Sequence, residues 1–157
     1  MTQGEPVPFP SLAWFAKLGE RMNADRTRHE HLGYVDCVVE FVVRDAYRPG
    51  RPLRAQVTFE EFSVVDVREA GPADAGRADF ALEADPKAWR EMIERVARGK
   101  GRPELDQTLN YLSHFETPFR VCAEDPLKRD LYFRYNQSLQ EFINASAEIA
   151  TKFDGQA

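Results

Sequence analysis

The stretch DFALEADPKAWREMIERVAR, residues 79–98, contains the clearest change of hydrophobic period in the chain. Every second residue from Phe80 to Ala84 is apolar, which is the period of a β-strand with one buried face. Asp85 and Pro86 follow, and they supply a side-chain cap and a proline at the first position of a helix. The next apolar residues recur at offsets of three and four, so they share one helix face. That face consists of Trp89, Met92, Ile93 and Val96.

Hydrophobic periodicity on both sides of this stretch predicts the remaining elements. Ser11 is placed to cap a first helix that ends near residues 23–25, and a helix between Pro103 and Thr117 is expected to bury Leu105, Leu109 and Leu112. Between the second and third strands, Glu60-Glu61 leaves a tight turn and one long bent strand both open. Strands are predicted at residues 34–44, 53–60, 62–68, 79–84 and 119–122. This order favours an α+β domain, in which helices pack on one face of a five-stranded, mainly antiparallel sheet.

The last helix is predicted to run from Pro126 to about Lys152, with a buried stripe of Leu131, Tyr135, Leu139, Phe142, Ile149 and Phe153. Such a helix is roughly 40 Å long, more than a small domain spans, so we expect part of it to pack on a second copy in a homodimer. The predicted organisation is therefore a mobile lead-in at residues 1–10, a domain at 11–125, and a long C-terminal helix and tail at 126–157.

Composition narrows the class of protein. A chain of 157 residues with 43% hydrophobic residues is the size of one domain with one core. The net charge of −5 argues against nucleic acid or an anionic membrane as the main partner. Cys37 and Cys122 lie in apolar runs and are expected to be buried free thiols, as in a reducing cytoplasm. The sequence shows neither a signal peptide nor an apolar run long enough for a stable membrane anchor.

Catalytic and metal-binding patterns are weak. His29-Glu30-His31 would need a third ligand with a recognisable spacing, so it is interpreted as a solvated loop. His114 near a helix end is interpreted as a dipole partner or core residue. Carboxylates such as Glu60, Glu61, Asp79, Glu83 and Asp85 fit a solvent face. No cofactor and no metal are predicted, and an enzyme that uses Glu60, Asp79 or Glu83 on a bound hydrophobic substrate is left open.

Aromatic side chains and a methionine are concentrated on the elements expected to meet between the sheet and the helices. Such side chains either fill a core or line an adaptable apolar cavity, and the sequence leaves both open. The residues predicted to bind a hydrophobic ligand are Phe59, Phe62, Phe80, Leu82, Trp89, Met92, Ile93, Phe115 and Phe119.

The order of elements resembles the sterol carrier protein family, in its second-type lipid-binding fold. The resemblance rests on the helix at 11–23, the strands at 34–44 and 53–68, and ADFALEADPKAWREMIE at 78–94, and it covers residues 9–122. It departs from the family at Glu60-Glu61, where the family usually has a glycine-bearing turn, and at the long last helix, which replaces a short mobile one.

The resemblance implies a hydrophobic tunnel between sheet and helices that binds sterols, fatty acids or fatty acyl-CoA without altering them. Carried over by position, Phe80, Leu82, Trp89, Met92 and Ile93 would face that tunnel. The predicted function is non-catalytic binding or transfer of a hydrophobic small molecule. The alternative is a homodimeric interaction module with a filled core and no ligand.

Overall fold

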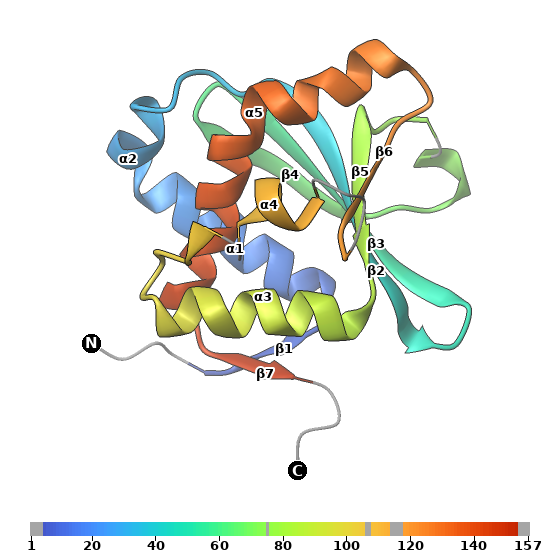
Figure 1. The fold of residues 1–157 in the computed structure, drawn as a ribbon. Helices are drawn as coiled ribbons and strands as arrows, with labels where there is room; N and C mark the ends of the chain where they lie inside the picture. Colours follow the sequence, from blue (N-terminus) through green and yellow to red (C-terminus); the bar gives the residue numbers. More distant parts are fainter. Residues whose placement is uncertain (1–4, 75, 106–107, 114–117, 154–157) are drawn as a thin grey trace.

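A mixed five-stranded sheet forms the centre of the protein (Figure 1). The computed structural model describes residues 5–74, 76–105, 108–113 and 118–153. The strands lie in the order β4-β3-β2-β5-β6, with β2 at Cys37–Arg48, β3 at Arg51–Glu60, β4 at Ser63–Glu69, β5 at Phe80–Ala84 and β6 at Arg120–Cys122. β2 and β5 are parallel, and the other neighbouring pairs are antiparallel. The predicted five-stranded, mainly antiparallel sheet is confirmed.

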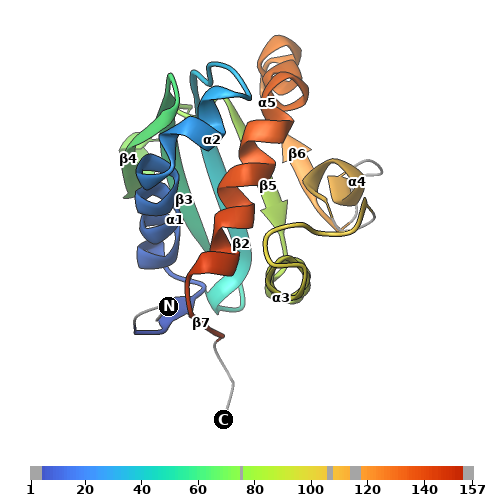
Figure 2. The same cartoon turned by 90° about the vertical axis from the view of Figure 1, so that its left-hand side faces the viewer.

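Three helices pack on one face of this sheet (Figure 2): α1 (Leu12–Ala24), α3 (Pro86–Arg98) and α5 (Pro126–Asn144). Phe41 on the central strand β2 shows how they meet. Its ring lies 5.3 Å from Phe15 of α1, 6.2 Å from Trp89 of α3 and 5.5 Å from Phe142 of α5. All four side chains are fully buried, so one aromatic cluster joins the three helices to the sheet.

The strand-to-helix junction at residues 79–98 is confirmed. Asp85 accepts a hydrogen bond from the backbone N–H of Ala88 at 2.8 Å, and Pro86 is the first residue of α3. The Ser11 cap is also confirmed, because its Oγ accepts from the N–H of Trp14 at 3.1 Å. Each cap satisfies a backbone donor that the first turn of the helix leaves without a partner.

A tight turn connects β3 to β4. Glu60 pairs with Ser63 across the hairpin, and Glu61 between them has φ +56°. This positive φ is uncommon for a residue with a side chain, and it provides the sharp reversal that a glycine would usually provide. The alternative of one long bent strand is therefore wrong.

The C-terminal segment differs from the prediction. α5 ends at Asn144, not near Lys152, and is followed by a 3₁₀ turn, η3 (Ala145–Glu148), and by strand β7 (Thr151–Phe153). The 19 residues of α5 therefore span only about 29 Å. The offsets of seven residues from Phe142 to Ile149 and of four from Ile149 to Phe153 predict a continued helix, but both side chains are buried after the helix has ended, Ile149 just after η3 and Phe153 on β7.

Strand β7 pairs in parallel with β1 (Val7–Phe9) at the other end of the chain. Phe9 is 1% exposed and contacts Trp14 and Phe153, at ring distances of 4.7 and 6.0 Å. Residues 7–9 of the predicted lead-in thus belong to the packed structure. The division of the chain at residues 10 and 125 stays a prediction.

Two short α-helices, α2 (Arg26–Glu30) and α4 (Leu109–Ser113), and a 3₁₀ turn, η1 (Pro72–Asp74), complete the described part of the chain. In α4, Leu109 is fully buried and Leu112 is half-buried. Leu105 is 85% exposed, so its assignment to a buried helix face is wrong. His114 and Phe115 lie outside the described residues.

Candidate ligand-binding site

Most of the predicted ligand-binding side chains are brought together on the helix side of the sheet. None of the following is more than 2% exposed: Phe59, Phe80, Leu82, Trp89, Met92, Ile93 and Phe119. Phe62 lies elsewhere, half-buried in the β3–β4 turn, where its ring stacks on Tyr34 at 4.8 Å and on the Arg26 guanidinium at 5.4 Å. Phe115 lies outside the described residues. The predicted apolar cluster therefore exists in the structure, but Phe62 does not belong to it.

Trp89 is at the centre of this group. Its ring lies 4.9 Å from Phe119 of the β6 region, 5.9 Å from Phe15 and 6.1 Å from Phe9. Its indole Nε1 donates a hydrogen bond to the backbone oxygen of Val42 at 3.0 Å. Because the polar group is satisfied and the ring is surrounded, Trp89 has one fixed orientation in the core.

A buried pair of hydroxyl groups lies beside this apolar region. Tyr132 Oη and Ser113 Oγ are 2.7 Å apart, and Ser113 also donates to the backbone oxygen of Leu109 at 2.7 Å. The Tyr132 ring contacts Phe80 at 5.9 Å. Burial raises the pKa of Tyr132, so its hydroxyl stays protonated and is available as a donor.

Sequence reasoning missed Tyr132 because it placed Leu131 and Tyr135 on the buried face of the first half of α5, whereas its assignment of Leu139 and Phe142 to that face is confirmed. The buried apolar residues of that helix are Tyr132, Leu139, Phe142 and Ile143, whereas Leu131 and Tyr135 are half-buried. The signal that could have found Tyr132 is its seven-residue offset from Leu139, which places both on one helix face.

Helix α4 lies beside this region, between α3 and α5 and next to β6 (Figures 1 and 2). Among the described residues, three polar contacts join it to its neighbours: Gln140 Oε1 accepts from the N–H of Leu109 at 2.7 Å, Ser113 Oγ lies 2.7 Å from Tyr132 Oη, and the backbone oxygen of Leu112 accepts from the N–H of Phe119 at 3.1 Å. A helix of five residues is too short to be stable by itself. Its position therefore depends on these contacts and on the buried side chain of Leu109.

The remaining candidate groups have structural roles or lie apart. His29 is buried in α2 and His31 is exposed, so the prediction that both lie in a solvated loop is wrong. No group of three metal-ligating side chains occurs among the described residues. Asp79 accepts a hydrogen bond from the backbone N–H of Val38 at 2.8 Å, which fixes the start of β5.

Neither Cys37 nor Cys122 forms a disulfide, as predicted; Cys37 is buried, whereas Cys122 is only half-buried and its Sγ lies 3.7 Å from Glu83 Oε2. Burial, with smaller contributions from Asp79 and Asp36, raises the pKa of Cys37 to about 12. Its thiol is therefore neutral and a poor nucleophile at ordinary pH.

A pocket of about 850 Å³ opens on the opposite face of the sheet. Of the predicted site residues in the described part of the chain, Phe80 alone lines it. The structure thus has an apolar region under the helices, where the predicted side chains meet, and a separate open pocket behind it.

No protein-family model matches the sequence, and no curated protein matches it either. Two solved structures match over nearly the whole chain. The solution structure of a conserved hypothetical protein of Thermus thermophilus, described as a candidate sterol carrier protein, has a TM-score of 0.67 at 17% identity over 97% of each chain. The crystal structure of sterol carrier protein 2 has a TM-score of 0.62 at 19% identity over 88% of this chain and 96% of that one.

This chain has the sterol carrier protein fold. The two matches therefore confirm the fold that the resemblance in the sequence predicts. Sequence identities of 17% and 19% do not show that the proteins share a ligand. Within the described residues, none of the helices combines the length and hydropathy needed to cross a bilayer.

Proposed function

We propose that the protein binds or carries a hydrophobic small molecule, such as a lipid, fatty acyl or sterol-like compound, without altering it. The ligand would lie between sheet and helices, bounded by α3, β5, β6 and α4. The observation that carries this proposal is the buried Tyr132–Ser113 hydroxyl pair beside the apolar group of Phe80, Trp89 and Phe119. An apolar region with one or two polar groups is the usual composition of a small-molecule site, in which the polar groups orient the ligand.

Entry of a ligand requires rearrangement, because the side chains of this region are packed against one another. The element that costs least to move is α4, with its short length and few contacts. A ligand that buries roughly 300 Å² of apolar surface gains about 7 kcal/mol before the costs of binding. Breaking the three polar contacts of α4 costs about 1 kcal/mol each, and exposing the buried side chain of Leu109 costs about 2 kcal/mol. For a ligand of fatty-acid size, the gain from burial therefore exceeds the cost of displacing α4.

The direct test is native mass spectrometry of the freshly purified protein, followed by solvent extraction and identification of any bound compound. Titration with the fluorescent fatty acid cis-parinaric acid then measures uptake. A co-purifying lipid-like mass or saturable uptake would support the proposal. A protein that carries nothing and takes up no parinaric acid would overturn it.

Ser113→Ala tests the position of the site. It removes both the hydroxyl beside the apolar group and a contact that holds α4 in place, so we expect the affinity for parinaric acid to change about fivefold, equivalent to about 1 kcal/mol. The matched control is Ser146→Ala, because this buried hydroxyl has no hydrogen-bond partner among the described residues. Equal affinity in both variants would place the ligand away from Ser113.

The homodimeric interaction module remains the competing function. Leu127 and Phe133 on the first half of α5 are 77% and 49% exposed, and they are the apolar side chains this helix offers to a partner. The second half packs inside this chain through Leu139 and Phe142, so truncation after Asp125 would destroy the core and is not a clean test. Sedimentation of the intact protein and of Leu127→Glu is cleaner. A dimer that Leu127→Glu dissociates, with no lipid uptake, would favour the module.

A further inference from the structure

The described part of the connection between β4 and β5, residues 70–74 and 76–79, crosses the sheet face that the helices leave open. β3 and β2 separate these two strands in the sheet, so the chain must pass over both. Gln56 of β3 shows where it passes: its side chain points away from the helices and donates to the backbone oxygen of Asp74 at 3.1 Å. Because the connection covers it, Gln56 is only 1% exposed.

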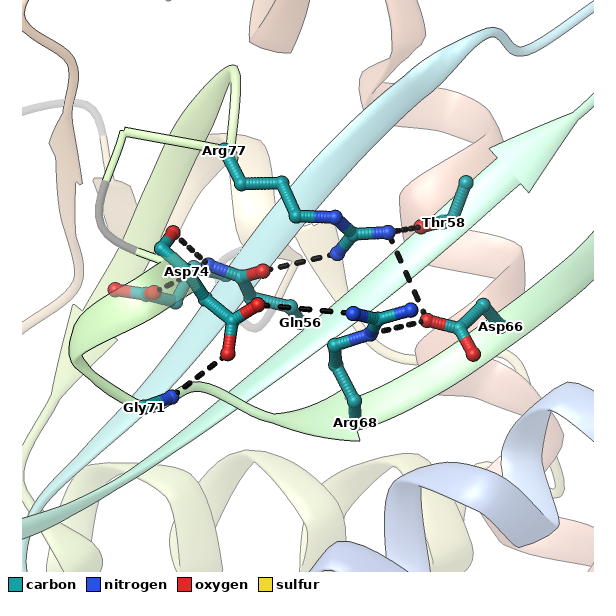
Figure 3. A network of polar contacts seen from close by, with 8 residues as sticks. Gln56, Thr58, Asp66, Arg68, Gly71, Asp74 and Arg77 are labelled. Atoms are coloured by element: carbon teal, nitrogen blue, oxygen red, sulfur yellow. Dashed lines mark hydrogen bonds and ion pairs between the residues drawn. The ribbon is translucent and has the colours of Figure 1, made fainter.

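A network of polar side chains holds this connection against the sheet (Figure 3). The Arg77 guanidinium donates to Gln56 Oε1 at 2.9 Å and to Thr58 Oγ1 at 3.1 Å. Arg68 of β4 donates to Asp66 at 2.7 Å and forms an ion pair with Asp74 at 3.6 Å. Together with the ion pair of Arg77 with Asp66 at 3.7 Å, these contacts with β3 and β4 give the connection a defined position.

The pocket of about 850 Å³ lies between this connection and the β6–α5 junction. We name it the outer-face pocket. Its floor includes Ala81 and Cys122, and its two walls come from residues 70–72, 76, 78 and 79 and from residues 123–125 and 128. Small residues account for the space, because their side chains leave the area between the walls unfilled: Ala70, Gly71, Gly76, Ala78, Ala81 and Ala123. The volume is within the range of small-molecule sites.

The residues that line the outer-face pocket carry more negative than positive charges. Four carboxylates, Glu40, Asp79, Glu124 and Asp125, face two cations, Arg54 and Lys128, an excess of two negative charges. Both cations already have a carboxylate partner: Arg54 contacts Glu40 at 3.1 Å, and Lys128 contacts Asp79 at 3.8 Å. The excess is therefore at the junction of β6 and α5, where Glu124 is exposed. A concave surface with one sign of charge attracts the opposite sign.

We propose that the outer-face pocket binds a small organic cation, namely an amine or amidine carried on a compact, flat, apolar body. The body lies on the smooth surface of Ala81 and the small wall residues, and the cationic group points toward Glu124 and Asp125. An anion of the same shape is excluded, because the two cations of the pocket are already paired. The site is separate from the apolar region under the helices, since the sheet lies between them.

Three ring compounds of nearly equal size test this inference: benzamidine, a cation; benzamide, which is neutral; and benzoate, an anion. Each is titrated into the intact protein and followed by backbone amide NMR shifts. We expect benzamidine to shift the amides of Gly71, Gly76, Ala81 and Ala123, to bind at least fivefold more tightly than benzamide, and to weaken as salt is added. Benzoate should bind least. Equal affinity for all three, or shifts confined to the helix side, would overturn the proposal.

Two variants locate the cation. Glu124→Gln should weaken benzamidine binding two- to threefold and leave benzamide unchanged, whereas Glu91→Gln, an exposed acid on α3, should change neither. Ala81→Phe fills the pocket on a strand position that accepts an aromatic residue, and it should abolish binding. If Ala81→Phe does not fold, Glu124→Gln decides the outcome. Unchanged benzamidine affinity in Glu124→Gln would overturn the proposal.

Cis-parinaric acid separates this inference from the proposed function. If the outer-face pocket is a distinct site, a saturating concentration of benzamidine leaves parinaric acid uptake unchanged. Competition between the two probes would place benzamidine under the helices and overturn the proposal. A protein that binds benzamidine but takes up no parinaric acid would overturn only the proposed function.

Discussion

Tyr132 of α5 and Ser113 of α4 place their hydroxyl oxygens 2.7 Å apart in an otherwise apolar region. Ser113 uses its own hydrogen for the oxygen of Leu109, so Tyr132 acts as the donor to Ser113. This contact links α4 to the core. Its contribution to stability can be tested by removing a single oxygen atom.

Tyr132→Phe removes that donor and should destabilise the protein by about 1 kcal/mol, because a buried hydrogen bond is lost while the ring is kept. Urea unfolding measures the free energy. Tyr111→Phe is the control, since Tyr111 is 60% exposed and its variant should stay within about 0.5 kcal/mol of the parent. Equal stability of Tyr132→Phe and the parent would show that the hydroxyl pair contributes nothing to folding.

Cys37 should resist alkylation in the folded protein. Its pKa of about 12 keeps the thiol protonated, and its side chain is 5% exposed. Iodoacetamide at pH 8, followed by peptide mass mapping, should therefore modify the half-buried Cys122 first and Cys37 only after unfolding. Modification of both at equal rates in the native state would contradict the burial of Cys37.

The same pKa shift predicts a loss of stability in alkali. The pKa of Cys37 in the folded protein, about 12, lies above the ordinary thiol value of 9.0, so the folded state binds the thiol proton more tightly than the unfolded state does. This contribution is fully present below about pH 9 and is lost as the pH rises toward 12. Cys37→Ala should therefore show a smaller decrease in unfolding free energy between pH 8 and pH 10 than the parent. An identical decrease in both proteins would show that the pKa of Cys37 is not raised in the folded state.

Phe9→Ala should be strongly destabilising, although Phe9 lies near the chain terminus. Its buried ring contacts four others, those of Trp14, Phe15, Trp89 and Phe153. Truncation of such a ring costs about 3–5 kcal/mol. Thermal unfolding followed by circular dichroism measures the effect, with Glu5→Ala, an exposed residue beside β1, as the control. A small effect of Phe9→Ala, similar to that of Glu5→Ala, would mean that the β1–β7 pair is not formed in solution.

Arg77→Ala should loosen the connection over the outer face. Its guanidinium makes hydrogen bonds to Gln56 and Thr58, and their loss costs about 1–3 kcal/mol. We expect faster hydrogen exchange at the amides of Ala70 and Asp74, with exchange in β2 unchanged. Arg98→Ala, at the exposed end of α3, is the matched control. Unchanged exchange at Ala70 and Asp74 would show that Arg77 does not hold the connection.

Local patterns predicted much of the fold. The change of period at residues 79–98, with the Asp85 cap and Pro86, located β5 and α3, because strand alternation, capping and proline geometry depend on residues only a few positions apart. The candidate site was predicted less well. Trp89 and Phe119 do meet, at 4.9 Å, but Phe62 packs on Tyr34 instead, since periodicity assigns a residue to a face and not to a contact.

The sequence by itself determined the order along the chain of the five strands of the central sheet, the places of α1 and α3 among them, and the caps that begin these two helices, all of which follow from interactions within a few residues. Only the tertiary structure decided the end of α5 at Asn144, the buried side of that helix, the pairing of Val7–Phe9 with Thr151–Phe153, the contact of Tyr132 with Ser113, and the outer-face pocket beside residues 70–74 and 76–79. These features depend on contacts between residues far apart in the chain, where the gain from burial and hydrogen bonding outweighs local preference.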